Sequence, residues 1–118
     1  MQMKKPKPLC FVYVNAAKYC GSDIAKIGIS NNPAKRLVEF NTGLRHRNRK
    51  GLISEPVRFW PFYYVAASSQ REARCIEKSF LQKHKRQIIQ GFGKEVVAMD
   101  PALVAQSVAC IAGAECAA

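Results

Sequence analysis

Apolar and polar positions alternate along some segments of the chain and follow a helical period along others, and each change of pattern marks an expected element. β-forming residues dominate two early segments, which predicts strands over 9–15 and 24–29. The polar connection between them, 16–23, is longer than a two-residue hairpin turn. A third strand is expected over 57–66, where Pro61 favours an edge position or a bulge. These segments predict a small sheet.

Two helices should flank the third strand. Asn31 or Asn32 can cap the first, Pro33 can occupy its first position, and the glycine of Asn41-Thr42-Gly43 should end it. The second and longest helix begins at the capping box Ser69-Gln70-Arg71-Glu72 and should run to about 87–90. Both carry apolar residues at helical spacing, so each should bury one face.

A short strand and a final helix complete the expected fold. The strand, 95–99, follows a glycine-rich turn, and Asp100-Pro101 begins a helix that should end near Ala112. This helix is apolar enough to be shared with a second copy of the chain, so a homodimer through it is one option. We therefore expect an α/β fold with a small three-stranded antiparallel or mixed sheet flanked by helices. Its parts would be a basic flexible arm, 1–8, a single domain, 9–112, and a frayed tail, 113–118.

Charge makes this small domain a candidate polyanion-binding protein. The chain of 118 residues has 19 Lys and Arg against 8 Asp and Glu, a formal net charge of +11, which favours nucleic acid as the partner. DNA is the first expectation, and RNA stays open. No apolar run is long enough to span a membrane, and the run after the basic N-terminus is too short for a signal-peptide core. We therefore expect a cytoplasmic protein without membrane contact.

The segment 44–51 has the highest density of positive side chains, and its composition and adjacent glycines favour an exposed loop. Arginine-rich loops contact phosphates without reading sequence, although a loop that only keeps the protein soluble would have the same composition. The longest helix adds further positive side chains. The candidate nucleic-acid-binding residues are Arg45, Arg47, Arg49, Lys50, Arg74 and Lys78.

Aromatic side chains are concentrated in the third expected strand. Core and cross-strand packing is the common role for residues such as Trp60, Phe62, Tyr63 and Tyr64. A tyrosine that faces outward could instead stack on an unpaired base.

Glu77 is the anomaly of the longest helix. Its position falls within an apolar stripe that includes Ile76 and Phe80. A carboxylate on a buried face costs free energy unless it is paired, protonated or bound to a cation. A metal ligand, an ion pair with Lys26 or Arg36, and a surface glutamate are the three interpretations.

Chemically active side chains converge on the first two strands and the helix after them. Tyr13 and Lys26 lie on the paired strands, and Gly28 exposes backbone beside them. Arg36 is carried by the helix. A phenol or an amine can take a proton from water, and a guanidinium offers planar donors that match phosphate oxygens. This combination suits a phosphodiester substrate.

On these residues the chain resembles the GIY-YIG nuclease superfamily, in particular its small single-domain phage and bacterial members with Lys-Ile-Gly as the second motif. Phe11-Val12-Tyr13 corresponds to the first motif and Lys26-Ile27-Gly28 to the second. Arg36 corresponds to the arginine of the following helix, and Glu77 to the metal-binding glutamate. Phe40 stands where many members have a histidine. The resemblance covers nearly the whole expected domain.

The resemblance implies an endonuclease that depends on Mg²⁺ or Mn²⁺ and hydrolyses phosphodiester bonds of DNA. Glu77 would bind one Mg²⁺, and Arg36 would stabilise charge on the phosphoryl oxygens. Tyr13 or Lys26 would be the general base. A second interpretation is a nucleic-acid-binding module of the same fold with weakened chemistry, because Phe11 is much bulkier than glycine. A third is a small structural or interaction protein.

Overall fold

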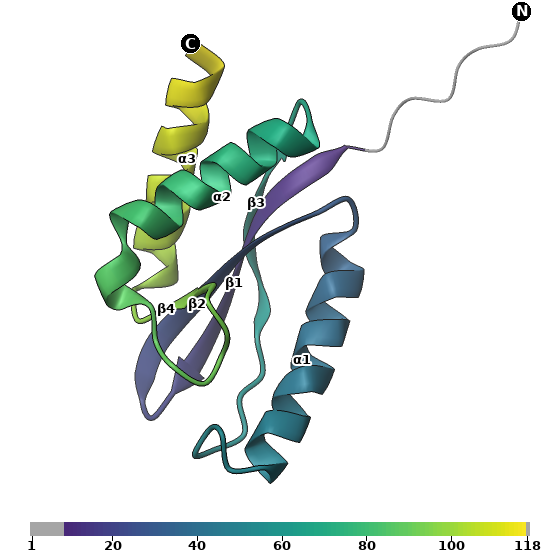
Figure 1. Ribbon diagram of the computed structural model, residues 1–118, viewed down its shortest axis with the longest axis vertical. Coiled ribbons are helices and arrows are strands. Elements are labelled where there is room, and N and C mark those ends of the chain that lie inside the picture. The colour runs from purple at the N-terminus through teal and green to yellow at the C-terminus, as the bar shows by residue number, and fades with distance from the viewer. Residues whose placement is uncertain (1–8, 118) are drawn as a thin grey trace, which may run out of the picture.

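The computed structural model describes residues 9–117, so the expected basic arm, 1–8, lies outside the described residues. Within them the chain forms three layers, with helices on both faces of a four-stranded antiparallel sheet in the order β3-β1-β2-β4 (Figure 1). The expected α/β class is confirmed, and the short fourth strand is present. The elements are β1 (Cys10–Tyr19), β2 (Ser22–Ser30), α1 (Pro33–Arg49), β3 (Trp60–Ala67), α2 (Gln70–Lys83), β4 (Val96–Val97) and α3 (Pro101–Ala117).

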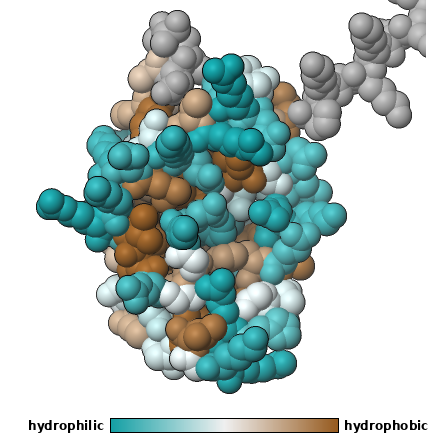
Figure 2. Space-filling view, in the orientation of Figure 1, coloured by the Kyte–Doolittle hydropathy of each residue, from teal (hydrophilic) through white to brown (hydrophobic). Residues whose placement is uncertain are grey.

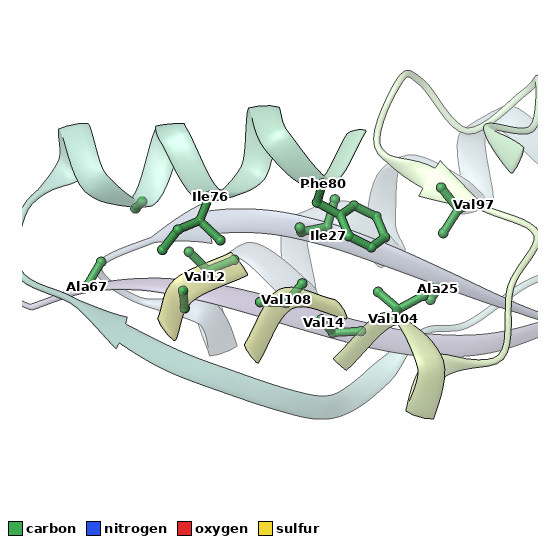
Figure 3. Packing of buried hydrophobic residues seen from close by; sticks show 12 residues of the cluster. Val12, Val14, Ala25, Ile27, Ala67, Ile76, Phe80, Val97, Val104 and Val108 are labelled. Carbon is green, nitrogen blue, oxygen red and sulfur yellow. The ribbon is translucent and has the colours of Figure 1, made fainter. Parts of the chain in front are cut away.

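The larger hydrophobic core lies between the sheet, α2 and α3 (Figure 3). Alternate residues of β1 and β2, such as Val12 and Ile27, point to this side. Ile76 and Phe80 of α2 and Val108 of α3 meet them there, and all five are almost completely buried. Burial of side chains of this size contributes about 1.5–3 kcal/mol each, so this cluster holds α2 and α3 against the sheet.

The intervening residues of β1 and β2 face α1. Tyr13 and Lys26 are among them, and both are buried. A second hydrophobic cluster lies on this face, built around Leu44 of α1 with Phe59 and Phe92 from the connecting segments. The two faces of the hairpin therefore differ, because one is purely apolar and the other also carries the candidate chemical groups.

β1 and β2 are longer than expected, and their connection is shorter. The strands pair continuously to Tyr19 and Ser22, so the connection expected over 16–23 is mostly strand. Only Cys20 and Gly21 turn, with positive φ values of 52° and 79°, as in the tight two-residue hairpins that match the strand twist. The expectation of a long connection is wrong because small buried alanines continue β1 where bulky apolar residues stop.

α1 runs through the segment that was expected to be a loop. The helix ends at Arg49, so most of 44–51 is helical and the expected stop at Asn41-Thr42-Gly43 is wrong. Leu44 is fully buried and continues the apolar stripe of α1 into the second cluster. Burial of this leucine outweighs the single glycine before it, since an internal glycine costs only about 1 kcal/mol.

Asn41 lies inside α1 and binds the chain before β3. Its Nδ2 donates to the carbonyl of Phe59 at 3.0 Å, and its Oδ1 accepts from the Phe59 N–H at 2.8 Å. These two bonds replace the partners that a neighbouring strand would give Phe59. They fix α1 against the segment that leads into the sheet.

β3 is an edge strand and begins later than expected, at Trp60. Pro61 pairs with Asn15 next to a shift of register between Val14 and Asn15. This position confirms that Pro61 occupies an edge strand beside an irregularity, where a missing N–H is tolerated.

The last two helices differ from expectation only at their ends. α2 follows the expected cap, in which Ser69 Oγ accepts from the Glu72 N–H at 3.1 Å, but it ends at Lys83 and not at 87–90. α3 continues to Ala117 and not to Ala112, so the described part of the expected frayed tail is helical. No helix within residues 9–117 has both the length and the apolar character needed to cross a membrane.

Candidate functional site

A cavity of about 370 Å³ lies between the β1–β2 hairpin, the middle of α1 and the turn before β4. Tyr13, Lys26 and Arg36, which the sequence singled out, all line it. Glu95, which the sequence analysis did not select, lines it as well. The cavity is also lined by Glu39, Phe40, Gly43, Arg47 and Lys94.

Gly28 makes room for the phenol of Tyr13. The two residues are paired across β1 and β2, and a Cβ atom on Gly28 would overlap the ring and the hydroxyl of Tyr13. Only glycine therefore allows the phenol to lie across β2. Tyr13 is 3% exposed in this position, and its hydroxyl points toward Lys26.

Lys26 is the central charge of the cavity. Its Nζ lies 2.8 Å from Glu95 Oε2 and donates to the Tyr13 hydroxyl at 3.5 Å. The lysine side chain is 7% exposed and that of Glu95 is 42% exposed. The ion pair with Glu95 thus holds Lys26 Nζ beside the phenol.

Phe40 closes the cavity over Lys26. Its ring centroid lies 4.7 Å from Lys26 Nζ, within the range in which an ammonium is attracted to an aromatic face. Phe40 occupies the position at which the resemblance would place a histidine. In this chain that position supplies an apolar wall and a cation–π contact, and it supplies no group that could carry a proton.

Arg36 lies at the rim of the cavity with an exposed side chain. Its Nη1 is 3.6 Å from Glu39 Oε2, one turn along α1. Exposed pairs of this kind contribute about 0–1 kcal/mol, so the guanidinium can exchange Glu39 for a phosphate at little cost.

Glu77 approaches the cavity without lining it. The carboxylate of this α2 residue is half-buried in an adjoining hollow, and Lys94 lines both spaces. Burial raises the pKa of Glu77 to about 7, and the negative charge of Glu95 adds to the rise, while Lys26 and Arg74 oppose it. The pKa therefore marks a carboxylate whose negative charge is poorly compensated.

The ion-pair interpretation of Glu77 is wrong. Lys26 pairs with Glu95, and Arg36 pairs with Glu39. Within the described residues Glu77 has no hydrogen bond and no salt bridge. A cation or a proton is then what would neutralise this carboxylate.

The donor set suits one hard cation. Among residues 9–117 no group of three or more His, Cys, Asp or Glu side chains is placed to enclose a metal ion. Mg²⁺ does not need such a cage, since it is commonly bound by one or two carboxylates together with waters and substrate phosphates. Glu77, with Glu95 close enough to influence its charge, fits that mode of binding.

The candidate nucleic-acid-binding residues divide between two sides of the sheet. Arg45, Arg49 and Lys50 are exposed at the end of α1, where positive charge also suits the helix dipole. Arg47 has a structural role as well, because its Nη1 donates to the Gly91 carbonyl at 2.7 Å. Hydrophilic side chains cover much of the face shown in Figure 2, with hydrophobic patches between them.

Arg74 and Lys78 belong to α2, which covers the opposite face of the sheet from α1. Both are exposed and flank Glu77 in sequence. These two cations therefore accompany the carboxylate and are separate from the cationic end of α1.

Sequence reasoning missed Glu95 and Lys94. Both follow a turn in which Gly91 and Gly93 adopt positive φ values of 97° and 93°, and β4 then pairs with β2 so that Lys26 meets Val96. The only sequence signal for their role was that these two charged residues directly precede a short strand. The pairing that brings Glu95 to Lys26, 69 residues away, is a tertiary contact.

In comparisons with known proteins, the chain matches no family model, no curated protein and no solved structure. What the site can do must follow from its own residues.

Proposed function

We propose that the protein is a divalent-metal-dependent nuclease that hydrolyses phosphodiester bonds, with DNA as the first candidate substrate and RNA as the second. One observation carries this proposal. A phenol, an ammonium and a guanidinium line one cavity, and a half-buried carboxylate with a raised pKa lies beside it. The formal net charge of +11 would bring a polyanion to that cavity.

Tyr13 is the better candidate for the general base. Lys26 Nζ is engaged in an ion pair with Glu95, so it is less available to accept a proton from water. In its deprotonated form the Tyr13 oxygen can accept a proton from the attacking water. The Lys26 ammonium, 3.5 Å away, stabilises the negative charge on that oxygen.

Arg36 and Lys94 would neutralise the phosphate. Arg36 can turn from Glu39 toward the cavity and offer two parallel N–H donors to phosphoryl oxygens. Lys94 lines both the cavity and the hollow of Glu77, so its ammonium can stabilise negative charge that develops on a phosphate between the two spaces.

Glu77 is the proposed metal ligand, and the negative charge of Glu95 acts on it. A bound Mg²⁺ would supply Lewis-acid stabilisation of the leaving oxygen. Glu77 is suited to hold the ion because its carboxylate is partly desolvated and unpaired within the described residues. Because Glu77 is the single carboxylate proposed to bind metal, one ion is expected and two are not.

The test is cleavage of supercoiled DNA, single-stranded DNA and RNA in Mg²⁺ or Mn²⁺. We expect Tyr13→Phe and Glu77→Gln each to reduce cleavage by at least about 100-fold, in line with loss of a general base or a metal ligand. Tyr19→Phe, at the tip of the hairpin, and Glu55→Gln, in the connection between α1 and β3, change the same functional groups away from the cavity and should leave cleavage intact. Cleavage that survives both site substitutions would exclude the proposed site.

A nucleic-acid-binding module without cleavage is the second candidate. The 3% exposure of Tyr13 favours it, because water reaches the phenol only if the cavity opens. The apolar Phe40 beside Lys26 points the same way. Binding of all three nucleic acids without cleavage of any would support this candidate over the nuclease.

A further inference from the structure

A second hollow on the α1 side of the sheet is mainly apolar. This groove has a volume of about 540 Å³ and lies between β1, β3 and the first turns of α1. Its volume is within the range of about 300–1,000 Å³ that is typical of pockets for small organic ligands. Tyr13 lines both the groove and the candidate cavity, so the two spaces border the same residue.

Aromatic rings form one wall of the groove. Tyr64 of β3 pairs with Tyr13 across the strands but is 65% exposed. The ring of Phe11 supports it edge-on, with centroids 5.5 Å apart and an interplanar angle of 86°. Leu37 and Val38 of α1 line the groove as well. Tyr64 therefore offers an open aromatic face that a neighbouring ring holds in place.

Asn15 lines the same groove and has unused hydrogen-bonding capacity. It is 3% exposed, yet its Nδ2 has no partner within the described residues, and no hydrogen bond of its side chain is found there. A buried amide without a partner costs free energy, and such groups are rare in folded proteins. Since nothing holds the amide, it can turn about its terminal torsion and present its donor to a ligand.

We propose that this groove receives an unpaired nucleobase of the bound strand. The base would stack on Tyr64, and one of its ring carbonyls would accept a hydrogen bond from Asn15 Nδ2. Aromatic side chains bind bases of single strands through such stacking, and a polar group nearby adds preference among bases. The site would then select single-stranded or locally opened nucleic acid, because a base inside a duplex cannot enter.

Charge favours a nucleobase over an apolar peptide side chain as the occupant. The chain carries a formal +11, and the groove shares Tyr13 with a cavity rimmed by Arg36 and Lys94. A ligand that brings both a flat ring and negative charge satisfies both spaces at once. The inference rests on the proposed nucleic-acid function, but it requires binding only and no cleavage.

The test compares strands that differ only in their bases. The probes are an oligothymidylate of about ten nucleotides, the length scale of single-strand sites, an abasic oligomer of equal length and charge, and a duplex. Binding is measured by fluorescence anisotropy in EDTA, so that no strand is cut. We expect the wild type to bind oligothymidylate about 5- to 150-fold more tightly than the abasic oligomer, the range set by stacking of one base.

Three variants assign that preference to the groove. Tyr64→Ala and Asn15→Leu should lower the ratio of the two affinities toward one while affinity for the abasic oligomer and the duplex stays the same. Trp60→Ala removes an exposed aromatic ring from the same strand outside the groove and should leave the ratio unchanged.

The inference is overturned if the wild type binds both oligomers equally, if Tyr64→Ala keeps the preference, or if Trp60→Ala loses as much of it. Cleavage in Mg²⁺ is scored separately on the same proteins. If the protein cuts DNA but shows no preference for bases, the nucleobase site is excluded and the nuclease proposal stands. If it shows the preference but never cuts, the groove is a nucleobase site of a binding module. If it binds no probe, both proposals are excluded.

Discussion

Lys26 and Glu95 form an ion pair of 2.8 Å in which the lysine is buried and the glutamate reaches solvent. The pair joins β2 to the start of β4, and the same ammonium reaches the hydroxyl of Tyr13. Glu95 thus positions the cation beside the proposed base, and its removal should affect both stability and chemistry.

Glu95→Gln should lower the free energy of unfolding by about 1–3 kcal/mol, because it leaves a buried ammonium without its counter-charge. Urea denaturation at neutral pH measures the loss. Asp23→Asn is the matched control, since it removes the carboxylate of an exposed pair with Lys18 at 3.6 Å, and that change should cost less than about 1 kcal/mol. Equal losses in the two variants would show that the buried pair has no special role.

Gly28→Ala should displace the phenol of Tyr13, because the new Cβ would occupy the space of its ring. We expect a loss of about 1–3 kcal/mol in stability from overpacking and cleavage as low as that of Tyr13→Phe. Gly43→Ala is the control for stability. Gly43 lies within α1 with open space around its Cβ position, so that substitution should stabilise the protein by about 0.5–1 kcal/mol.

Glu77 should make the protein less stable as pH rises from about 4.5 to about 7, the interval between the ordinary pKa of a glutamate and the pKa of Glu77 in the fold. In that interval the folded state binds more protons than the unfolded state, so the free energy of unfolding falls with increasing pH. Urea denaturation across this range should show the fall in the wild type and a smaller one in Glu77→Gln. Glu39→Gln, on the exposed side of α1, should behave like the wild type.

Mg²⁺ should reverse the effect of the Glu77 charge. Above pH 7 the carboxylate is ionised, and a ligand that binds only the folded state raises its stability. The melting temperature should therefore rise with Mg²⁺ at pH 8, rise less at pH 5.5, and stay constant in Glu77→Gln. A rise that Glu77→Gln retains would place the cation elsewhere.

Asn15→Leu should raise the free energy of unfolding by about 1 kcal/mol, because it replaces a buried amide that lacks a partner with an apolar side chain of similar size. Asn41→Leu offers the opposite case. Asn41 makes two hydrogen bonds to the backbone of Phe59, so its loss should cost about 1–3 kcal/mol or more. Thermal denaturation of the two variants measures these opposite changes, which distinguish an amide available to a ligand from one that stabilises the fold.

The sequence predicted the chemical groups of the cavity better than it predicted where the surrounding helices and strands end. Hydrophobic alternation and one proline at the start of α1 were enough to place Tyr13, Lys26 and Arg36 together. The end of α1 was missed because Gly43 is a strong local stop signal, while burial of Leu44 depends on Phe59 and Phe92, which are remote in the chain.

Glu95 could not be assigned from local pattern for the same reason. Its role depends on the pairing of β4 with β2, and a strand of two residues has almost no sequence signature. Glu77 was recognisable as an anomaly because a helix has a fixed period, but the true partner of Lys26 required the tertiary fold.

The continuity of α1 sets a fixed spacing on the molecule. A single rigid helix carries Arg36 near its start and Arg49 at its end, and at about 1.5 Å per residue the two positions are about 20 Å apart along the axis. That length corresponds to about six base pairs of duplex at 3.4 Å each. Because Arg36 and Arg47 both line the cavity, a polyanion bound along α1 would meet positive side chains at fixed distances beside it, whereas a flexible arginine-rich loop would not fix those distances.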